Sequence, residues 1–248
     1  MIAIIPVKGI PSVKKGDNLG KLIVDRLRRQ GEEFRPGDIA VVSQKIVSKA
    51  EGMLIPLSRI KPSEFAKTIA RESGKDSRQV EVILGQTKKI IRMRGGHLIT
   101  ETKHGFICAN AGVDQSNVGK TDSVTTLPRD SDASADRIRE TIQEITGRNV
   151  PIVVTDTFGR AWRVGQVNFA IGLSGLRPIR DYRGTKDMYR RTLQVTEIAV
   201  ADELASAAEL VMNKADRVPV ALIRGYNALR GRGTVNNLLR PEEFDLFR

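Results

Sequence analysis

The chain has 248 residues, of which 40% are apolar and 28% are charged, proportions typical of a folded protein that buries a core. Its one cysteine, Cys108, excludes an internal disulfide and a cysteine-based zinc site, and it suits a reducing cytoplasm. The net charge of +12 suits an anionic partner, but only 4% of residues are aromatic, which favours small polyanions over nucleic acid.

The N-terminal segment 1–10, MIAIIPVKGI, predicts an edge strand. It lacks a basic leading region, and Pro6 interrupts its apolar run too early for a signal peptide. No other apolar run approaches the roughly 18 residues that indicate a membrane span. We therefore expect a cytoplasmic protein that does not enter a membrane.

Short apolar runs alternate with amphipathic segments along the chain, without an internal repeat or a low-complexity linker. Strands are predicted at 39–43, 98–100, 106–110, 150–156 and 218–226. Helices are predicted at 17–31, 62–74, 131–148 and 186–214, with Ser134 as the N-cap of the third. This alternation predicts an α+β fold in which helices cover mixed sheets. Residues 1–248 are expected to form one domain or two intertwined subdomains.

The stretch 106–119, FICANAGVDQSNVG, begins as a buried strand and then places polar side chains between glycines. These polar residues are Asn110, Asp114, Gln115, Ser116 and Asn117. The later strand 150–156 ends in Asp156, next to Thr157. Carboxylate and hydroxyl oxygens at two strand ends are suited to hold Mg²⁺ or Mn²⁺ against nucleotide phosphates. In the alternative interpretation, Asp114 and Asp156 only shape turns by hydrogen bonding to their own backbone.

Two further segments carry lysines next to turns. Loop 9–17, GIPSVKKGD, leads into the first helix, and its backbone amides and Lys14 either hold phosphate or form a plain solvated connection. In 41–53, VVSQKIVSKAEGM, a helical turn would place Lys45 and Lys49 on one side as an anion clamp, the alternative being an exposed lysine-rich turn. The patterns G-x-x-x-x-G-K-[ST] and G-x-G-x-x-G are absent, so any nucleotide site is of a less common type.

The cysteine and the histidines give weaker indications. Cys108 lies in the apolar run 106–109, which predicts a buried small hydrophobic residue and not a nucleophile. His97 and His104 are not paired at helical spacing, and each is expected to be a surface residue and not a metal ligand.

Four motifs follow one another along the chain. They are IVSKAEG (46–52), NAGVDQSNVG (110–119), VVTDTFGRAWRVGQVNFAIGLSG (153–175) and VADELASAAELVM (200–212). In this order they resemble the coenzyme F420-0:γ-glutamyl ligase family, and the resemblance extends from PVKGIP (6–11) to PVALIRGY (219–226). It implies a two-part α+β fold and a homodimer.

The resemblance also implies an activity. A chain that resembles this family is expected to be a GTP-dependent ligase. Such a ligase joins the amine of L-glutamate to the lactyl carboxylate of coenzyme F420-0 and then adds further glutamates through γ-linkages. GDP and phosphate are released. Two divalent ions, Mg²⁺ or Mn²⁺, together with K⁺, are the cofactors that the resemblance implies.

Site residues are carried over by position. Asp114 and Asp156 resemble metal ligands, with Thr157 on a second ion. The remaining carried-over positions resemble contacts of the nucleotide. These positions are Ile10, Pro11, Ser12, Val13, Gln44, Lys45, Lys49, Asn117, Met212, Asn213, Lys214, Ala215, Asp216 and Arg217. Lys45, Lys49 and Arg160 are expected to offset phosphate or carboxylate charge, and no residue stands out as a general base.

The loop after the last helix departs from the family pattern. The family often has Gly followed by Gln or Glu there, an extra oxygen donor near the metals, whereas this chain has Asn213 and Lys214. A protonated lysine does not bind a cation, so either Asn213 substitutes or the second ion is held differently. A flavin-reductase-like extension, fused to some relatives, is not expected because the chain has too few residues for it.

Two alternatives to this ligase stay open. One is a related metal- and nucleotide-dependent enzyme that acts on another acid, which the altered 213–214 pair favours. The other is a basic nucleic-acid-binding protein without catalysis, which the net charge favours.

Overall fold

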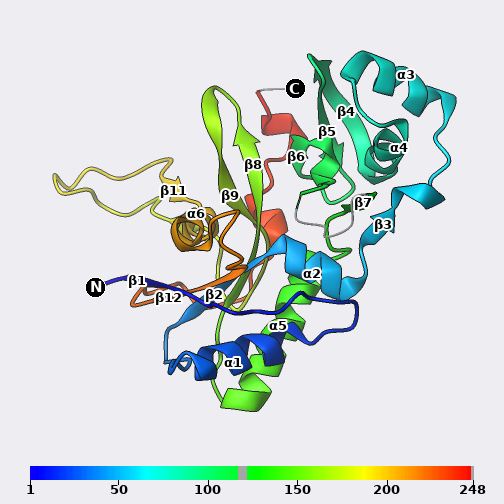
Figure 1. The fold of residues 1–248 in the computed structure, drawn as a ribbon. Coiled ribbons are helices and arrows are strands. Elements are labelled where there is room, and N and C mark those ends of the chain that lie inside the picture. Colours follow the sequence, from blue (N-terminus) through cyan, green and yellow to red (C-terminus); the bar gives the residue numbers. More distant parts are fainter. Residues whose placement is uncertain (117–121, 247–248) are drawn as a thin grey trace.

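The computed structural model describes residues 1–116 and 122–246 and contains a mixed sheet of five strands (Figure 1). In spatial order these are β1 (Ala3–Pro6), β12 (Val220–Arg224), β2 (Ile39–Ser43), β8 (Ile152–Arg160) and β9 (Arg163–Ser174). β2 and β8 run parallel, and the other neighbouring pairs are antiparallel. The predicted edge position of the N-terminal strand is confirmed, since β1 pairs only with β12 in this sheet.

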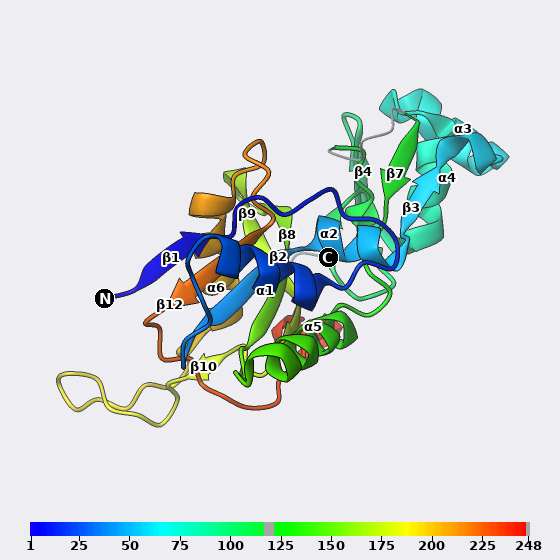
Figure 2. The same ribbon diagram turned by 60° about the horizontal axis from the view of Figure 1, so that its bottom comes forward.

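Helices cover both faces of this five-stranded sheet (Figures 1 and 2). They are α1 (Leu19–Arg29) and α5 (Ser131–Thr146) on one face and α6 (Val200–Met212) on the other. Successive side chains of a strand point to opposite faces. In β2, Ala40 and Val42 therefore join the core under α1 and α5, whereas Ile39 and Val41 join the core under α6. The predicted α+β fold with helices on a mixed sheet is confirmed.

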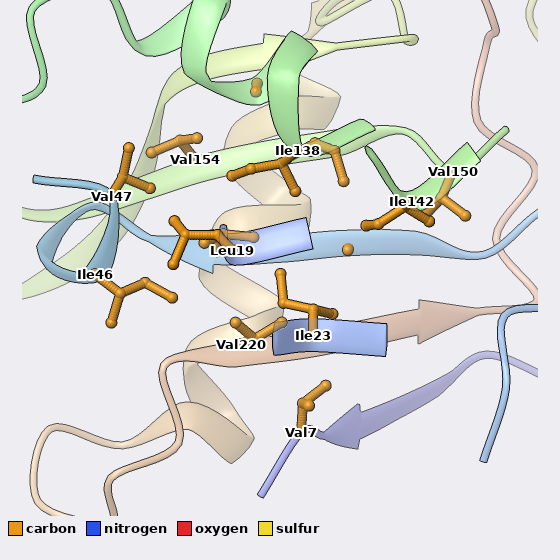
Figure 3. Packing of buried hydrophobic residues seen from close by; sticks show 14 of the residues in the cluster. Val7, Leu19, Ile23, Ile46, Val47, Ile138, Ile142, Val150, Val154 and Val220 are labelled. Atoms are coloured by element: carbon orange, nitrogen blue, oxygen red, sulfur yellow. The ribbon is translucent and has the colours of Figure 1, made fainter. Parts of the chain in front are cut away.

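The core under α1 and α5 fixes the elements that later form the site. Figure 3 shows Leu19 of α1 near Ile138 of α5 and Ile23 of α1 near Val220 of β12, with Val154 of β8 in the same cluster. Helix α2 (Gln44–Glu51) contributes Val47 to this core. Burial of each aliphatic side chain stabilises the fold by about 2 kcal/mol. These contacts hold α2 and β8 in a defined relative position.

The segment between α2 and α5 forms a separate group of elements, seen at the upper right of Figure 1. In chain order it comprises β3 (Leu54–Pro56), η1 (Leu57–Arg59), α3 (Glu64–Ser73), α4 (Ser77–Gln86), β4 (Thr87–Arg94), β5 (His97–Thr102), β6 (Ile107–Ala109), η2 (Asn110–Gly112) and β7 (Ser123–Thr125). It has a core of its own, which includes Leu57, Ile83, Leu98 and Val124. The chain thus leaves the main sheet after α2 and returns to it at α5.

The last part of the chain adds an arm and two short helices. Strands β10 (Arg180–Asp181) and β11 (Glu197–Ile198) form the base of the arm, which projects away from the rest of the chain (Figures 1 and 2). The short helices η3 (Val235–Leu238) and η4 (Glu242–Phe244) lie near β9 and β4, and Lys89 of β4 pairs with Glu242 at 3.2 Å. Among residues 1–116 and 122–246, no helix is long and apolar enough to cross a membrane.

The predicted helix at 186–214 is wrong in its first half. Only its alanine-rich second half is helical, and it forms α6. In the first half, the Asp187 carboxylate accepts hydrogen bonds from the backbone N–H groups of Tyr189, at 2.9 Å, and Arg191, at 2.8 Å. Such side-chain bonds compete with helical ones and favour turns.

Two smaller differences concern the N-cap of α5 and the presence of α4. Asp130, not Ser134, is the N-cap of α5, because its carboxylate accepts the Ala133 N–H at 2.9 Å. The Ser134 hydroxyl instead donates to Glu51 of α2. Helix α4, which buries Val80, Val82 and Ile83, was not predicted from the sequence. The other predicted strands and helices are present, with ends displaced by a few residues.

Candidate functional site

Lys45 lies at the start of α2, directly after β2. The Ser43 hydroxyl caps this helix by accepting the Lys45 N–H at 3.4 Å, and Gly52 ends it with a φ of 76°. The Lys45 side chain is only 17% exposed. Its ammonium group donates to Asp114 Oδ2 at 2.7 Å, to the Ser116 carbonyl oxygen at 2.9 Å and to Ser116 Oγ at 2.8 Å. The predicted helical turn is confirmed, and the alternative of an exposed lysine-rich turn is wrong.

Asp114 is held from both its backbone and its side chain. Its backbone exchanges two hydrogen bonds with Thr125, at 3.0 and 2.8 Å. Its carboxylate accepts the Ser116 N–H at 2.7 Å, which is the turn-forming bond of the alternative interpretation. Burial alone would raise the pKa of this carboxyl, but Lys45 and Ser116 outweigh it and hold the pKa below its usual value. Asp114 is therefore a charged group that both shapes a turn and faces Lys45.

Asp156 lies inside β8, where it pairs with Phe169 of β9, and not at the end of a strand as predicted. The strand continues to Arg160 because β8 and β9 form one long hairpin. Burial raises the pKa of Asp156 to about 6. The backbone N–H of Thr157 opposes this rise, and the negative charge of Asp114 adds to it.

The structure brings together charges that lie far apart in the sequence. The pKa of Asp156 is raised by Asp114 and lowered by the cations Lys45 and Lys214. These four groups come from β8, from the segment after η2, from α2 and from the loop after α6. A second carboxylate and two ammonium groups thus act on the Asp156 carboxylate, and such clusters of interacting charges are common at functional sites.

Cys108 of β6 borders this region. Its side chain is 6% exposed, and burial, together with the negative charge of Asp156, raises the pKa of the thiol to about 12. A thiol with so high a pKa is protonated at neutral pH and is a poor nucleophile. The prediction of a buried small hydrophobic residue is confirmed.

Thr157 faces away from Asp156, because neighbouring residues of a strand point to opposite faces. Its hydroxyl donates to Asn168 Oδ1 at 2.8 Å, and Asn168 Nδ2 donates to Glu209 Oε2 of α6 at 2.9 Å. The structure therefore does not bring the Asp156 carboxylate and the Thr157 hydroxyl together as neighbouring side chains. Asn168 and Glu209 were missed by sequence reasoning, although Asn168 lies within the motif 153–175.

Gln44 and Lys49 belong to the same helix as Lys45 but differ in their surroundings. Gln44 is 2% exposed, and its amide group donates to Ser48 Oγ at 2.7 Å and to the Thr126 carbonyl at 3.0 Å. Its two N–H groups are thus used within the protein. Lys49 is half-buried, and burial together with the neighbouring Lys45 charge lowers its pKa. A group that is costly to keep charged gains stability from a bound anion.

The loop with Ile10, Pro11, Ser12 and Val13 runs beside α2. Val13 is 6% exposed and Ile10 packs against the main core, whereas Pro11 and Ser12 are exposed. Farther along this loop, the Gly16 N–H donates to the Ala50 carbonyl of α2 at 2.8 Å. The loop is therefore fixed to the helix that carries Lys45.

The segment 212–217 after α6 is the other candidate wall of a nucleotide site. Met212 is buried at the end of the helix. Asn213 has a φ of 44°, and its side chain donates to Asp216 Oδ2 at 2.9 Å. Lys214 carries one of the charges that act on Asp156, so this segment reaches the charged region. Ala215 and Arg217 are exposed.

The other predicted residues lie apart from this region or outside the described residues. Asn117 falls outside the described residues. Arg160 donates to the Val164 carbonyl at 2.8 Å across the tip of the β8–β9 hairpin. His97 is exposed, and half-buried His104 lies 3.2 Å from the Arg129 carbonyl. In the part of the chain that the structure describes, no three His, Cys, Asp or Glu residues are grouped closely enough to hold a metal ion alone.

Comparisons with known proteins identify the family. Residues 9–225 match the family described as F420-0:Gamma-glutamyl ligase. The "Coenzyme F420:L-glutamate ligase" of Methanothermobacter thermautotrophicus is 50% identical over 250 residues, covering 100% of this chain and 99% of that protein. The protein with the same name in Methanocaldococcus jannaschii is 43% identical, covering 96% of this chain and 94% of its own.

A third relative, in Archaeoglobus fulgidus, has the same name and is 40% identical over 248 residues, covering 100% of this chain and 96% of its own. Matches of this identity over nearly complete chains show a shared fold and a shared family. The resemblance seen in the four sequence motifs is confirmed. This chain belongs to the F420-0:Gamma-glutamyl ligase family.

Proposed function

We propose that this chain is a ligase that uses GTP to attach L-glutamate to coenzyme F420-0 through an amide bond. The observation that carries the proposal is the contact between Lys45 and Asp114 next to Asp156, in a chain of the ligase family. Phosphoryl transfer between two anions needs cations and metal-binding carboxylates in one place. The names of the relatives support L-glutamate and coenzyme F420 as substrate and product class.

Asp114 and Asp156 fit one divalent ion, Mg²⁺ or Mn²⁺. Both are oxygen donors, and the charge of each is felt by the other, which is the arrangement that a hard cation stabilises. When bound, the ion would offset the negative charge of the phosphoryl group that is transferred. A second divalent ion near Thr157 and a K⁺ ion rest on the family resemblance alone. The Thr157 hydroxyl faces Asn168, and Lys214 occupies the loop where relatives often carry an oxygen donor.

The reaction has two steps. A carboxylate oxygen of F420-0 attacks the γ-phosphorus of GTP, the bond to the bridging oxygen breaks, and GDP leaves. The acyl phosphate is then attacked at its carbonyl carbon by the glutamate amine, which loses a proton as phosphate departs. Lys45 and Lys49 would offset the charge of the phosphates in the first step, and no side chain is assigned as the base in the second.

The nucleotide is proposed to lie between the loop 10–13, helix α2 and the segment 212–217. The bond between Gly16 and Ala50 supports this placement, since it ties the first loop to the helix of Lys45. The effect of Lys214 on Asp156 supports the inclusion of the last segment. Gln44 is still proposed as a nucleotide contact, but only through its side-chain carbonyl oxygen, because its side-chain N–H groups donate within the protein. Asn117 is proposed as a further nucleotide contact on the basis of the family resemblance alone.

We also propose a homodimer and a cytoplasmic location. A homodimer agrees with large apolar side chains that are exposed on the arm, Met188 at 85%, Tyr189 at 73% and Val195 at 84%. A cytoplasmic location agrees with the use of GTP and with the buried, reduced Cys108.

The test is an assay with F420-0, L-glutamate, Mn²⁺ and either GTP or ATP, read by mass spectrometry. We expect a product heavier by one or more glutamyl units, with GDP formed in equal amount. If the F420-0 carboxylate carries a heavy oxygen isotope, one label should appear in the released phosphate, because that oxygen bridges carbon and phosphorus in the acyl phosphate.

Other outcomes would point to the alternatives. GDP formed without a glutamylated product, and restored product with a different acid, would indicate a related ligase. Affinity for RNA that falls steeply with salt and exceeds the affinity for GTP would indicate the nucleic-acid-binding protein.

A further inference from the structure

A pocket of about 200 Å³ lies where the β8–β9 hairpin meets β6 and the C-terminal segment. Three phenylalanine rings, Phe106, Phe158 and Phe169, line it together with Leu238 and Leu239. The centroids of Phe106 and Phe158 are 6.1 Å apart with an angle of 52° between the rings, and those of Phe158 and Phe169 are 5.9 Å apart with an angle of 25°. A pocket lined by rings in these orientations suits a flat aromatic ligand that they contact by face and by edge.

One acidic side chain adds a hydrogen-bond acceptor to this apolar pocket. Asp202 of α6 lines it, and its Oδ1 accepts the Ala170 N–H at 2.9 Å. Its other carboxylate oxygen makes no hydrogen bond with a described residue. No Lys, Arg or His occurs among the described residues that line the pocket. The pocket therefore suits an uncharged ring with an N–H or O–H donor at its edge, and it does not suit phosphate.

The pocket lies next to the charged region of the site. Phe158 follows Asp156 by two residues in β8, so both point to the same face at a spacing of roughly 7 Å. Phe106 precedes Cys108 by two residues, and the negative charge of Asp156 contributes, after burial, to the raised pKa of the Cys108 thiol. The cationic helix α2 begins after Ser43, which pairs with Thr155. Along β8, Asp156 thus lies between the level of the lysines and the aromatic pocket.

A ligand with an aromatic ring at one end and anionic groups at the other fits this arrangement. Coenzyme F420-0 has such a form, because a flat deazaflavin ring is joined by a sugar-alcohol chain to a phosphodiester and a terminal carboxylate. GTP has its three phosphates close to its base and is matched by the lysines of α2. The two substrates would then approach Asp156 from opposite directions.

We infer that the pocket of Phe106, Phe158, Phe169 and Asp202 binds the deazaflavin ring of F420-0, so that its carboxylate end reaches the region of Asp156. The inference rests on the proposed function, since it takes F420-0 as the acceptor. The phenylalanine rings contact the deazaflavin by face and by edge, and the second oxygen of Asp202 accepts a hydrogen bond from an N–H of the deazaflavin. The pocket accordingly determines which acid is used as the acceptor.

Gly159 is a position at the pocket where a larger residue can be introduced. It lines the pocket, it is exposed, and no described residue lies within 4 Å of the position that a Cβ atom would take. Gly159→Leu therefore adds bulk at a residue that lines the pocket, without a Cβ clash. Gly85→Leu is the matched control, because Gly85 in α4 also has open space around it and lies in the separate group of elements. Phe158→Leu removes the ring while keeping most of its volume.

Binding is measured with F420-0 alone, through the change in its own fluorescence, and GTP binding is measured separately by calorimetry. We expect Gly159→Leu and Phe158→Leu to weaken F420-0 binding by about tenfold or more, with GTP affinity within about twofold of the wild type. Gly85→Leu should match the wild type in both measurements.

Several results would overturn the inference. One is F420-0 affinity within about twofold of the wild type in both variants. A second is a loss of GTP affinity in Gly159→Leu, which would assign the pocket to the nucleotide. A third is a change from dimer to monomer with unchanged F420-0 affinity, which would assign it to a second copy of the chain. Wild-type protein that binds F420-0 through this pocket but does not glutamylate it would refute the proposed function and leave the pocket assignment intact.

Discussion

The Lys45 ammonium group lies 2.7 Å from Asp114 Oδ2 and also reaches the carbonyl and hydroxyl oxygens of Ser116. The ammonium group thus lies beside Asp114, where the proposed metal cation would bind. In the proposed site, a cation at Asp114 Oδ2 would compete with this ammonium group, which would then be available to a phosphate anion. Metal binding and nucleotide binding would be linked through the position of one side chain.

Replacement of Lys45 by Met tests this link. The variant should bind Mn²⁺ severalfold more tightly in the absence of nucleotide, because the competing ammonium group is gone. Its GTP affinity should fall by about tenfold or more, because a charge that would face phosphate is lost. Paramagnetic resonance for Mn²⁺ and calorimetry for GTP measure the two effects. Lys67→Met is the control, since Lys67 pairs with Glu64 on the surface of α3. Weaker Mn²⁺ binding in Lys45→Met would show that Lys45 positions Asp114 and does not compete with the ion.

Asp156 is expected to destabilise the metal-free protein at neutral pH. Its folded pKa is raised from 3.8 to about 6, so the folded state prefers the protonated form. The loss of unfolding free energy caused by charging Asp156 is absent below pH 3.8, grows as the pH rises to about 6, and is constant above that. Asp156→Asn should therefore be more stable than the wild type by about 1–3 kcal/mol at pH 7.5.

Urea unfolding in the presence of a chelator, from pH 4 to pH 8, measures this difference. The advantage of Asp156→Asn should disappear near pH 4. An advantage that does not change over this range would mean that burial does not raise the pKa of Asp156.

The sequence was sufficient to predict the main sheet because its strands are continuous apolar runs, such as 39–43, bounded by turns. It was not sufficient for 186–199, where the Asp187 carboxylate binds the backbone of Tyr189 and Arg191. Whether such a bond replaces a helical one depends on the folded neighbours and not on the local composition.

The candidate site, like the fold, could be predicted only in part from the sequence. Lys45, Asp114 and Asp156 could be proposed because each lies near the end of an apolar run and belongs to a recognisable motif. The contact of Lys45 with Asp114 and their nearness to Asp156 could not be predicted, because they arise from the packing of segments separated by long stretches of chain. The direction of the Thr157 side chain required the register of β8 with β9, and the aromatic pocket required the position of β6 beside that hairpin.

Cys108 should be unreactive in the folded protein. Its thiol is buried and its pKa is raised to about 12, so the thiolate is scarce at neutral pH. Iodoacetamide at pH 8 should label the native protein far more slowly than the protein unfolded in urea, as followed by mass spectrometry. Cys108→Ala should retain turnover within about threefold, because only a small apolar group is replaced. Loss of turnover in a folded Cys108→Ala protein would contradict the structural role.

Gly172 should be sensitive to substitution. A Cβ atom there would lie 2.4 Å from Ser131 Cβ and 2.5 Å from the Ser131 backbone, where β9 packs against the start of α5. Gly172→Ala should lower the free energy of unfolding by about 2–3 kcal/mol, since backbone must move to relieve the contact. Gly159→Ala, in the neighbouring strand with open space around it, should change it by about 0.5 kcal/mol or less. Equal effects of the two changes in thermal unfolding would show that β9 and α5 are not packed as described.

The central claim is that the region of Lys45, Asp114 and Asp156 is the active site of a GTP-dependent ligase. Its most direct test is the rate of glutamyl addition to F420-0 by the wild type and by Asp156→Asn, measured by mass spectrometry with GTP, L-glutamate and Mn²⁺. The wild type should give glutamylated product together with GDP. Asp156→Asn should remain folded and lose activity by about a thousandfold or more. Activity of Asp156→Asn within about tenfold of the wild type would contradict the claim.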